Sequence, residues 1–127
     1  MNVERSREAV AGERSRATVL PHHKLIAFAV AKDLLIAVRA AGIRDAKLRD
    51  EATRAAKGAC LNCAEAAGRV TRPDKARALT IARGEAVEAA AAVEIAALCG
   101  DTSRSSALEV ARIADRLVAL LTAFIRP

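Results

Sequence analysis

The segment from Arg54 to Arg69, RAAKGACLNCAEAAGR, consists almost entirely of small residues and lies between segments rich in Leu, Ile and Val. Gly58 inside this segment and Gly84 in the next one each cost about 1 kcal/mol relative to Ala in a helix interior. That cost is acceptable where two helix backbones must approach closely. The segment therefore predicts a close-packing surface between helices.

The composition favours helices along the whole chain. Of the 127 residues, 53% are hydrophobic, much of this fraction is alanine, and Phe28 and Phe124 are the only aromatic residues. Ala, Leu, Glu and Arg are strong helix formers, and the β-branched residues are scattered rather than alternating. A chain of this length forms one domain with a real core.

Start and stop signals divide the chain into a flexible N-terminal arm, residues 1–19, and four helices within residues 20–127. Pro21, Asp45 and Thr71 are start signals, and glycines at 42, 68 and 100 are stop signals. The predicted helices span about 21–42, 45–67, 71–99 and 104–125. The apolar stripe of the last helix includes Leu108, Ala111, Leu117, Leu121 and Phe124. Short turns between these helices predict an all-α, up-down-up-down antiparallel four-helix bundle.

The cysteines raise the possibility of a metal or redox site. Cys60 and Cys63 form a CxxC motif, which is half of many zinc sites. The other half is missing, because His22, His23 and Cys99 would have to complete it from other helices. An odd number of cysteines is typical of reduced thiols. We expect buried thiols with no metal, cofactor or disulfide, and a small metal-binding or catalytic bundle is the second alternative.

The polar residues of the opening segment predict a structural cluster. Asn62 and Glu65 are three residues apart and share one helix face. A buried carboxyl with a raised pKa could perform acid–base chemistry, but no nucleophile accompanies it. We expect a structural polar clasp formed by Arg54, Asn62 and Glu65, with Arg54 or Arg69 as the counter-charge of Glu65, and a non-enzymatic protein.

The charge of the chain indicates an acidic partner. Lys and Arg number 21 and Asp and Glu number 15, which gives a net charge of +6 without a solid basic tract. Weak binding of RNA or DNA through phosphates is expected, and the lack of exposed aromatic residues argues against base stacking. The candidate contacts are Arg69, Arg72, Lys75, Arg112 and Arg116. For the last two, pairing within the helix, such as Glu109 with Arg112, is an equal alternative.

No apolar run reaches the ~18–20 residues of a membrane span. The longest candidate, LIAFAVAKDLLIAV, is interrupted by Lys32 and Asp33. No apolar core of a signal peptide follows the N-terminal arginines. We therefore expect a cytoplasmic protein with no membrane partner.

Three segments resemble one protein family. Residues 54–69 resemble the pattern RAAxSIxxNIAEGxGR, and LTIARGEAVE, residues 79–88, resembles LxIAxGSxxE. Residues 25–34, LIAFAVAKDL, resemble LxxWxxAxxL with Phe28 for the Trp. These are patterns of the 23S rRNA intervening-sequence proteins, also called the four-helix-bundle protein family. The departures from the patterns include Gly58, Cys60, Ala66 and Glu85.

The resemblance implies a bacterial four-helix bundle that assembles as a ring-shaped homopentamer. The family is similar to the accessory variability proteins of diversity-generating retroelements, which are basic pentamers that bind a reverse transcriptase and nucleic acid. The resulting hypothesis is a non-enzymatic pentameric scaffold with modest electrostatic nucleic-acid binding. It would serve as an accessory factor to a reverse transcriptase or an rRNA-associated element. The alternative is a scaffold for protein–protein interaction without nucleic-acid contact.

Overall fold

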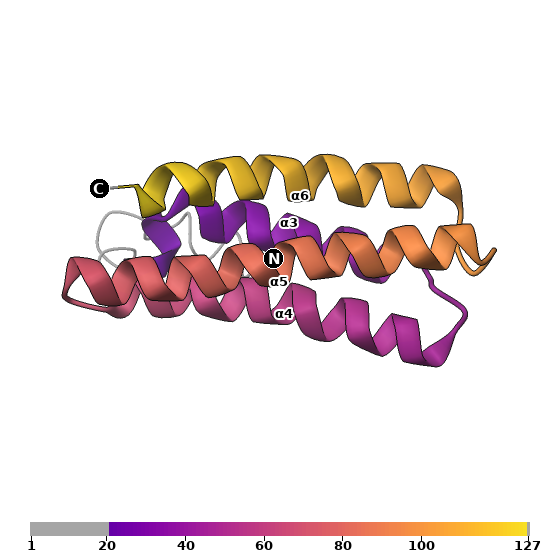
Figure 1. Ribbon diagram of the computed structural model, residues 1–127, viewed down its shortest axis with the longest axis horizontal. Coiled ribbons are helices and arrows are strands. Elements are labelled where there is room, and N and C mark those ends of the chain that lie inside the picture. The colour runs from indigo at the N-terminus through magenta and orange to yellow at the C-terminus, as the bar shows by residue number, and fades with distance from the viewer. Residues whose placement is uncertain (1–20, 127) are drawn as a thin grey trace, which may run out of the picture.

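A computed structural model describes residues 21–126, which form a bundle of four long helices (Figure 1). The predicted N-terminal arm, residues 1–19, lies outside the described residues. The elements are the 3-10 turn η1 (Pro21–Lys24), α3 (Ile26–Ala40), α4 (Ala46–Gly68), α5 (Arg72–Leu98) and α6 (Arg104–Ile125). The predicted all-α four-helix bundle is confirmed.

Local capping sets most of the helix boundaries. The side chains of Asp45, Thr71 and Ser103 accept hydrogen bonds from backbone N–H groups three residues further on, at 2.9, 3.3 and 2.9 Å. Each bond satisfies a donor that a helix start leaves unpaired. Gly42 and Gly100 follow α3 and α5 with φ of 56° and 78°, the left-handed region that favours glycine at a helix end.

The first helix starts later than the sequence predicts. Leu25 has an extended backbone, with φ −88° and ψ 117°, between η1 and α3. Its N–H donates to the carbonyl oxygen of His22 at 3.1 Å, which closes the turn. Pro21 therefore begins a separate 3-10 turn, and α3 begins at Ile26.

Helices adjacent in sequence pack side by side and run in opposite directions, and the first helix, α3, also packs against the last helix, α6 (Figure 1). The α4–α5 interface is the most extensive. The buried residues of these two helices are mainly alanines: Ala52, Ala55, Ala56, Ala59 and Ala66 on α4, and Ala78, Ala82, Ala86, Ala89, Ala92 and Ala96 on α5. The close-packing surface predicted from the small residues lies here.

The buried line of α6 differs from the predicted stripe. It consists of Val110, Ala114, Leu117 and Leu121. Leu108 and Phe124 are 59% and 43% exposed. Leu108 lies about 160° around α6 from Val110, on the face turned away from the buried line, and Phe124 lies in the last turn of the helix.

The two interior glycines have different surroundings. A Cβ atom on Gly58 would lie 2.7 Å from Oε2 of Glu85, so the missing side chain makes room for a carboxylate from α5. A Cβ atom on Gly84 would meet no atom within 4 Å. The expectation that Gly84 permits a close approach inside the bundle is wrong, because Gly84 lies on the outer face of α5.

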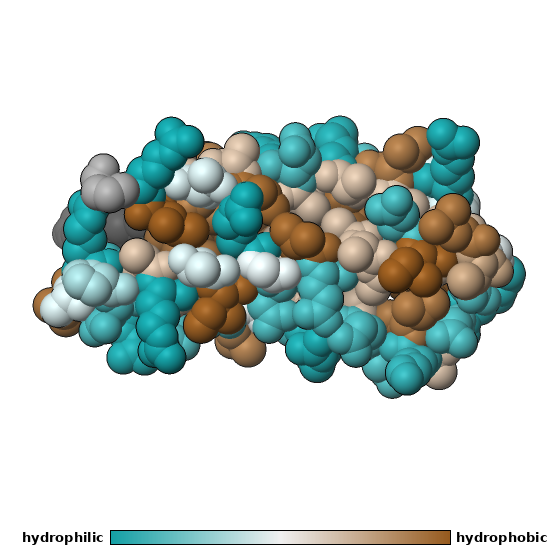
Figure 2. Space-filling model, in the orientation of Figure 1, coloured by the Kyte–Doolittle hydropathy of each residue, from teal (hydrophilic) through white to brown (hydrophobic). Residues whose placement is uncertain are grey.

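Apolar side chains also reach the surface. Figure 2 shows brown and tan residues between teal borders along the face on which α5 lies. Val87, Ile95 and Leu98 of α5 are among the exposed large apolar residues, at 50%, 47% and 81%.

Candidate nucleic-acid interface

Three of the predicted phosphate contacts lie together at the end of the bundle where α4 turns into α5. Arg69 follows the last residue of α4, and Arg72 and Lys75 lie in the first turn of α5. Arg69 forms an ion pair with Glu65 at 2.6 Å. The Nη2 atom of Arg72 donates to the backbone carbonyl of Arg126 at 2.7 Å.

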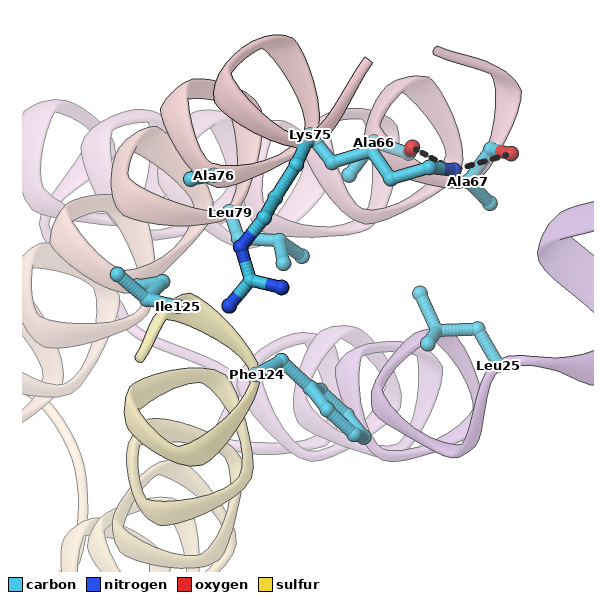
Figure 3. A pocket seen from close by; sticks show the side chains of 9 residues that line it. Leu25, Ala66, Ala67, Lys75, Ala76, Leu79, Phe124 and Ile125 are labelled. Atoms are coloured by element: carbon cyan, nitrogen blue, oxygen red, sulfur yellow. Dashed lines mark hydrogen bonds between the residues drawn. The ribbon is translucent and has the colours of Figure 1, made fainter. Parts of the chain in front are cut away.

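Lys75 binds the end of α4. Its Nζ atom donates to the carbonyl oxygens of Ala66 and Ala67 at 3.3 and 3.5 Å, as the dashed lines of Figure 3 show. The last carbonyl groups of a helix lack partners within the helix and carry partial negative charge. Lys75 therefore stabilises the C-terminus of α4, in addition to any contact with a ligand.

The partners of these cations decide how much charge each one offers to a ligand. The carboxylate of Glu65 compensates the charge of Arg69, and this pair raises the pKa of Arg69. Carbonyl oxygens are neutral, so Arg72 and Lys75 keep their full positive charge. Arg72 is exposed and Lys75 is half-buried. Of these three residues, Arg72 is the exposed cation that no carboxylate compensates.

A pocket of about 250 Å³ lies beside these cations (Figure 3). It is lined by Leu25, Ala66, Ala67, Arg72, Lys75, Ala76, Leu79, Phe124 and Ile125. Phe124 is 43% exposed here, so the prediction that no aromatic residue is exposed is wrong. An aromatic ring beside two cations is a combination typical of single-strand nucleic-acid sites. The apolar stripe of α6 could not reveal that Phe124 is exposed, because Phe124 lies in the last turn of the helix, at the end of the bundle.

The two candidates on α6 have different surroundings. Arg112 binds Glu109 through two hydrogen bonds, from Nε at 3.2 Å and from Nη2 at 2.8 Å. This pairing lowers the pKa of Glu109 and raises that of Arg112. Arg116 is exposed, and it lines a 410 Å³ groove between α3 and α6 together with Asp33 and Arg112. The structure therefore agrees with the pairing alternative for Arg112, whereas Arg116 forms no ion pair with the described residues.

A charged cluster that the sequence reasoning missed spans α4 and α5. The Nη2 atom of Arg54 lies 2.7 Å from Glu51 and 2.6 Å from Glu88, and Nη1 lies 3.8 Å from Glu85. Contact with Glu88, followed by Arg54, lowers the pKa of Glu51, while contact with Glu51 and burial raise the pKa of Glu88. Arg54 and Glu88 come from the two segments with the most specific family patterns, so these segments meet in space.

Glu85 occupies the space left by Gly58. Its side chain is 21% exposed, and its Oε1 atom is buried without a hydrogen-bond partner in this chain. The Arg54 nitrogen at 3.8 Å is within ion-pair distance but too far for a hydrogen bond. The cluster therefore has more carboxylate groups than the single guanidinium can satisfy.

The three residues of the predicted polar clasp are not brought together within one chain. Arg54 contacts the carboxylates just described. Asn62 donates from Nδ2 to the carbonyl of Gly58 at 2.9 Å, and Glu65 is exposed and pairs with Arg69. Among the side chains whose exposure the structure describes, no polar or charged one is buried.

The thiols are free, with Cys60 and Cys63 buried and Cys99 exposed. Burial raises the pKa of Cys60, and it raises the pKa of Cys63 to about 12. The described part of the chain contains no group of three or more His, Cys, Asp or Glu side chains that could hold a metal ion.

Comparison with known proteins places the chain in a family. Residues 25–123 match the family described as 23S rRNA-intervening sequence protein. None of the curated proteins matches the chain. In the helices of residues 21–126, no stretch is both long enough and apolar enough to cross a membrane.

Proposed function

Because the chain belongs to the 23S rRNA-intervening sequence protein family, we propose that it is a self-assembling helical scaffold that binds nucleic acid weakly through phosphates. The observation that carries this proposal is the uncompensated charge of Arg72 and Lys75 at one end of the bundle. No catalytic role is known for this family, and the proposed function is non-enzymatic.

The supporting argument is electrostatic. The chain carries a net charge of +6, and a basic surface attracts phosphates without reading base sequence. Arg69 and Arg112 contribute little, because carboxylates neutralise them. Arg72, Lys75 and Arg116 are the contacts that this proposal retains from the original five. A single exposed ring, Phe124, adds at most a small preference for single strands.

Assembly multiplies this charge. The family resemblance suggests a ring-shaped homopentamer, and a ring repeats the Arg72 and Lys75 pair once per chain on one rim. Several weak sites on one rim bind a continuous nucleic acid more tightly than one site does, because later contacts form within the same complex. Light scattering coupled to size exclusion tests the ring, and the mass of a single chain at micromolar concentration would refute it.

Fluorescence anisotropy with labelled single-stranded RNA and duplex DNA at two salt concentrations tests the binding. Affinity should fall as the salt concentration rises. A plot of the logarithm of the association constant against the logarithm of the salt concentration should fall with a slope of about 0.7 per phosphate contact for single strands and about 0.9 for duplex DNA. Arg72→Gln should weaken binding and reduce that slope. The matched control is Arg112→Gln, which makes the same change of net charge away from this end of the bundle and should weaken binding much less than Arg72→Gln.

A further variant separates phosphate binding from stacking. Phe124→Leu keeps an apolar wall in the pocket and should leave duplex binding unchanged. A selective loss of RNA affinity would show that the ring stacks on bases. No binding by the wild type even at low salt would favour the scaffold for protein–protein interaction. In that case a reverse transcriptase or another protein from the same genetic element is the partner to test by co-purification.

A further inference from the structure

Helix α5 is apolar on two opposite faces. One face packs into the core through residues such as Ala82, Ala86 and Val93. The other face points to solvent and is called here the outer stripe. It consists of Thr80, Gly84, Val87, Ala91, Ile95 and Leu98, all exposed. Steps of three and four residues place these six positions within an arc of roughly 80° on a helix with 3.6 residues per turn.

The outer stripe presents apolar surface along its length. Val87 and Ile95 are about half exposed, and Leu98 is almost fully exposed. The hydroxyl of Thr80 donates to the carbonyl of Ala76 at 2.8 Å, so the methyl group is left to face outward. Gly84 has open space where a side chain would be. A contiguous exposed apolar surface on a small protein typically marks an interface.

The sizes of the stripe residues are complementary under reversal. The small residues Thr80 and Gly84 lie in the N-terminal half, and the large residues Ile95 and Leu98 lie in the C-terminal half. An antiparallel copy of α5 centred near Ala89 would place Ile95 against Gly84 and Leu98 against Thr80. Val87 would lie against Ala91. Each large side chain then meets a small one, as close helix packing requires.

The charges beside the stripe follow the same symmetry. Arg83 and Glu94 lie on one flank, and eleven positions separate them along the helix, which is about 16 Å. They cannot pair within one chain, but antiparallel pairing places Arg83 beside the partner's Glu94, and this contact occurs twice. Glu94 forms no ion pair with any of residues 21–126. Arg83 uses only Nε, in a 2.8 Å bond to Thr122.

We propose that the outer stripe of α5 is a two-fold contact surface that binds the same stripe of a second copy of this chain in antiparallel orientation. A parallel arrangement would place Ile95 against Ile95 and would leave each Glu94 eleven positions along the helix from the partner's Arg83, so charge and shape both favour the antiparallel one. A two-fold contact uses the same patch on both partners, whereas a ring uses two different patches. The contact therefore joins two chains, or two rings if the ring forms, and it does not depend on the proposed ring.

A charge-reversal experiment tests the pairing. Sedimentation velocity at low salt should show that Glu94→Arg weakens pairing by about tenfold or more, because two attractive contacts become repulsive. The mass of the assembly should then halve. Combining Glu94→Arg with Arg83→Glu restores opposite charges in both contacts and should restore the mass. Asp115→Arg, the same charge change at an exposed site on α6, is the control and should have no effect.

Gly84→Leu provides the second test. It should weaken self-association if the proposed pairing is specific, and it should strengthen self-association if the contact is non-specific. The added side chain meets nothing in the folded chain, so the fold should be retained. It fills the position that receives the partner's Ile95, so the proposed pairing should be lost. Non-specific hydrophobic association would instead become stronger, because the variant exposes more apolar surface. Stronger association of the Gly84→Leu variant would overturn the proposal. A wild-type mass that corresponds to a single chain, or to a single ring with an odd number of chains, would also overturn it. In the last case the ring of the proposed function would stand without this contact.

Discussion

The contact between Gly58 and Glu85 can be tested by a double-mutant cycle, with Gly58→Ala measured in two backgrounds. Ala is about 1 kcal/mol more favourable than Gly in a helix interior. In the wild-type chain, however, the new Cβ atom would lie 2.7 Å from Oε2 and 2.8 Å from Cδ of Glu85. No side-chain carbon tolerates such distances, so the carboxylate must move.

The cost of that movement can be bounded. Forcing a side chain about 30° from its preferred rotamer costs roughly 0.5–1.5 kcal/mol. This cost offsets most of the helix-propensity gain, so Gly58→Ala should change the free energy of unfolding of the wild-type chain by close to zero. In a Glu85→Ala background the obstacle is gone, and the same substitution should add the full gain of about 1 kcal/mol.

Thermal unfolding followed by circular dichroism reports both effects at one fixed protein concentration. For a chain of 127 residues, 1 kcal/mol corresponds to a shift of about 4 °C in melting temperature. The Glu85→Ala background should show this rise upon Gly58→Ala, and the wild-type background should not. An equal rise in both backgrounds would show that Glu85 does not occupy the space beside Gly58, and the account of the α4–α5 contact would be refuted.

The remaining predictions concern the thiols and Glu65. In the native protein an alkylating reagent should modify Cys99 rapidly and should modify Cys60 and Cys63 only after unfolding, because only Cys99 is exposed. Mass spectrometry of the labelled protein follows the reaction of each cysteine over time. Equal, slow modification of all three cysteines would contradict the prediction. Since burial raises the pKa of Cys63 to about 12, the folded state holds its proton more tightly than the unfolded state. Its contribution to stability should be complete below the ordinary thiol pKa and be lost as pH rises towards 12, and Cys63→Ala should flatten that part of the stability profile. Glu65→Ala should leave the melting temperature unchanged, because its side chain is exposed and pairs only with another exposed group; a clear loss of stability would indicate that a second copy buries Glu65.

Local sequence signals predicted the helix boundaries well. Asp45, Thr71, Gly42 and Gly100 act on backbone groups within a few residues of themselves, so their effect does not depend on the rest of the fold. The start of α3 was the exception. Proline suits the first turn of an α-helix and a 3-10 turn equally, and the extended backbone of Leu25 that separates the two is not visible in the sequence.

The candidate site was predictable only where its contacts are local. The pairing of Glu65 with Arg69 follows from their spacing of four residues, and that of Glu109 with Arg112 from a spacing of three. The contact between Arg54 and Glu88 depends on the register between two helices, which small, similar alanine side chains do not specify in sequence.

The partners of the bundle-end cations were not predictable for a related reason. The acceptors are the backbone carbonyl of Arg126, just after α6, for Arg72 and two carbonyls of α4 for Lys75. Every residue carries such a group, so a sequence pattern cannot indicate which carbonyl a cation will meet. These contacts nevertheless decide which cations are compensated by a carboxylate, and therefore which of the predicted phosphate contacts remain.

The alanine-rich packing has a further consequence for how stability and assembly are related. The largest fully buried side chains of the described residues are only Leu34, Leu117, Leu121, Val93, Val110 and Cys63. Alanines on α4 and α5 bring the backbones close but remove little apolar area from water, and hydrophobic stabilisation scales with that area. At the same time α5 leaves Val87, Ile95 and Leu98 exposed. A second copy that covers the outer stripe would bury this area and, because it binds only the folded chain, would stabilise the fold by mass action. Folding and self-association of this chain should therefore be coupled, so that the melting temperature rises with protein concentration and Gly84→Leu weakens this dependence by removing the contribution of the outer stripe.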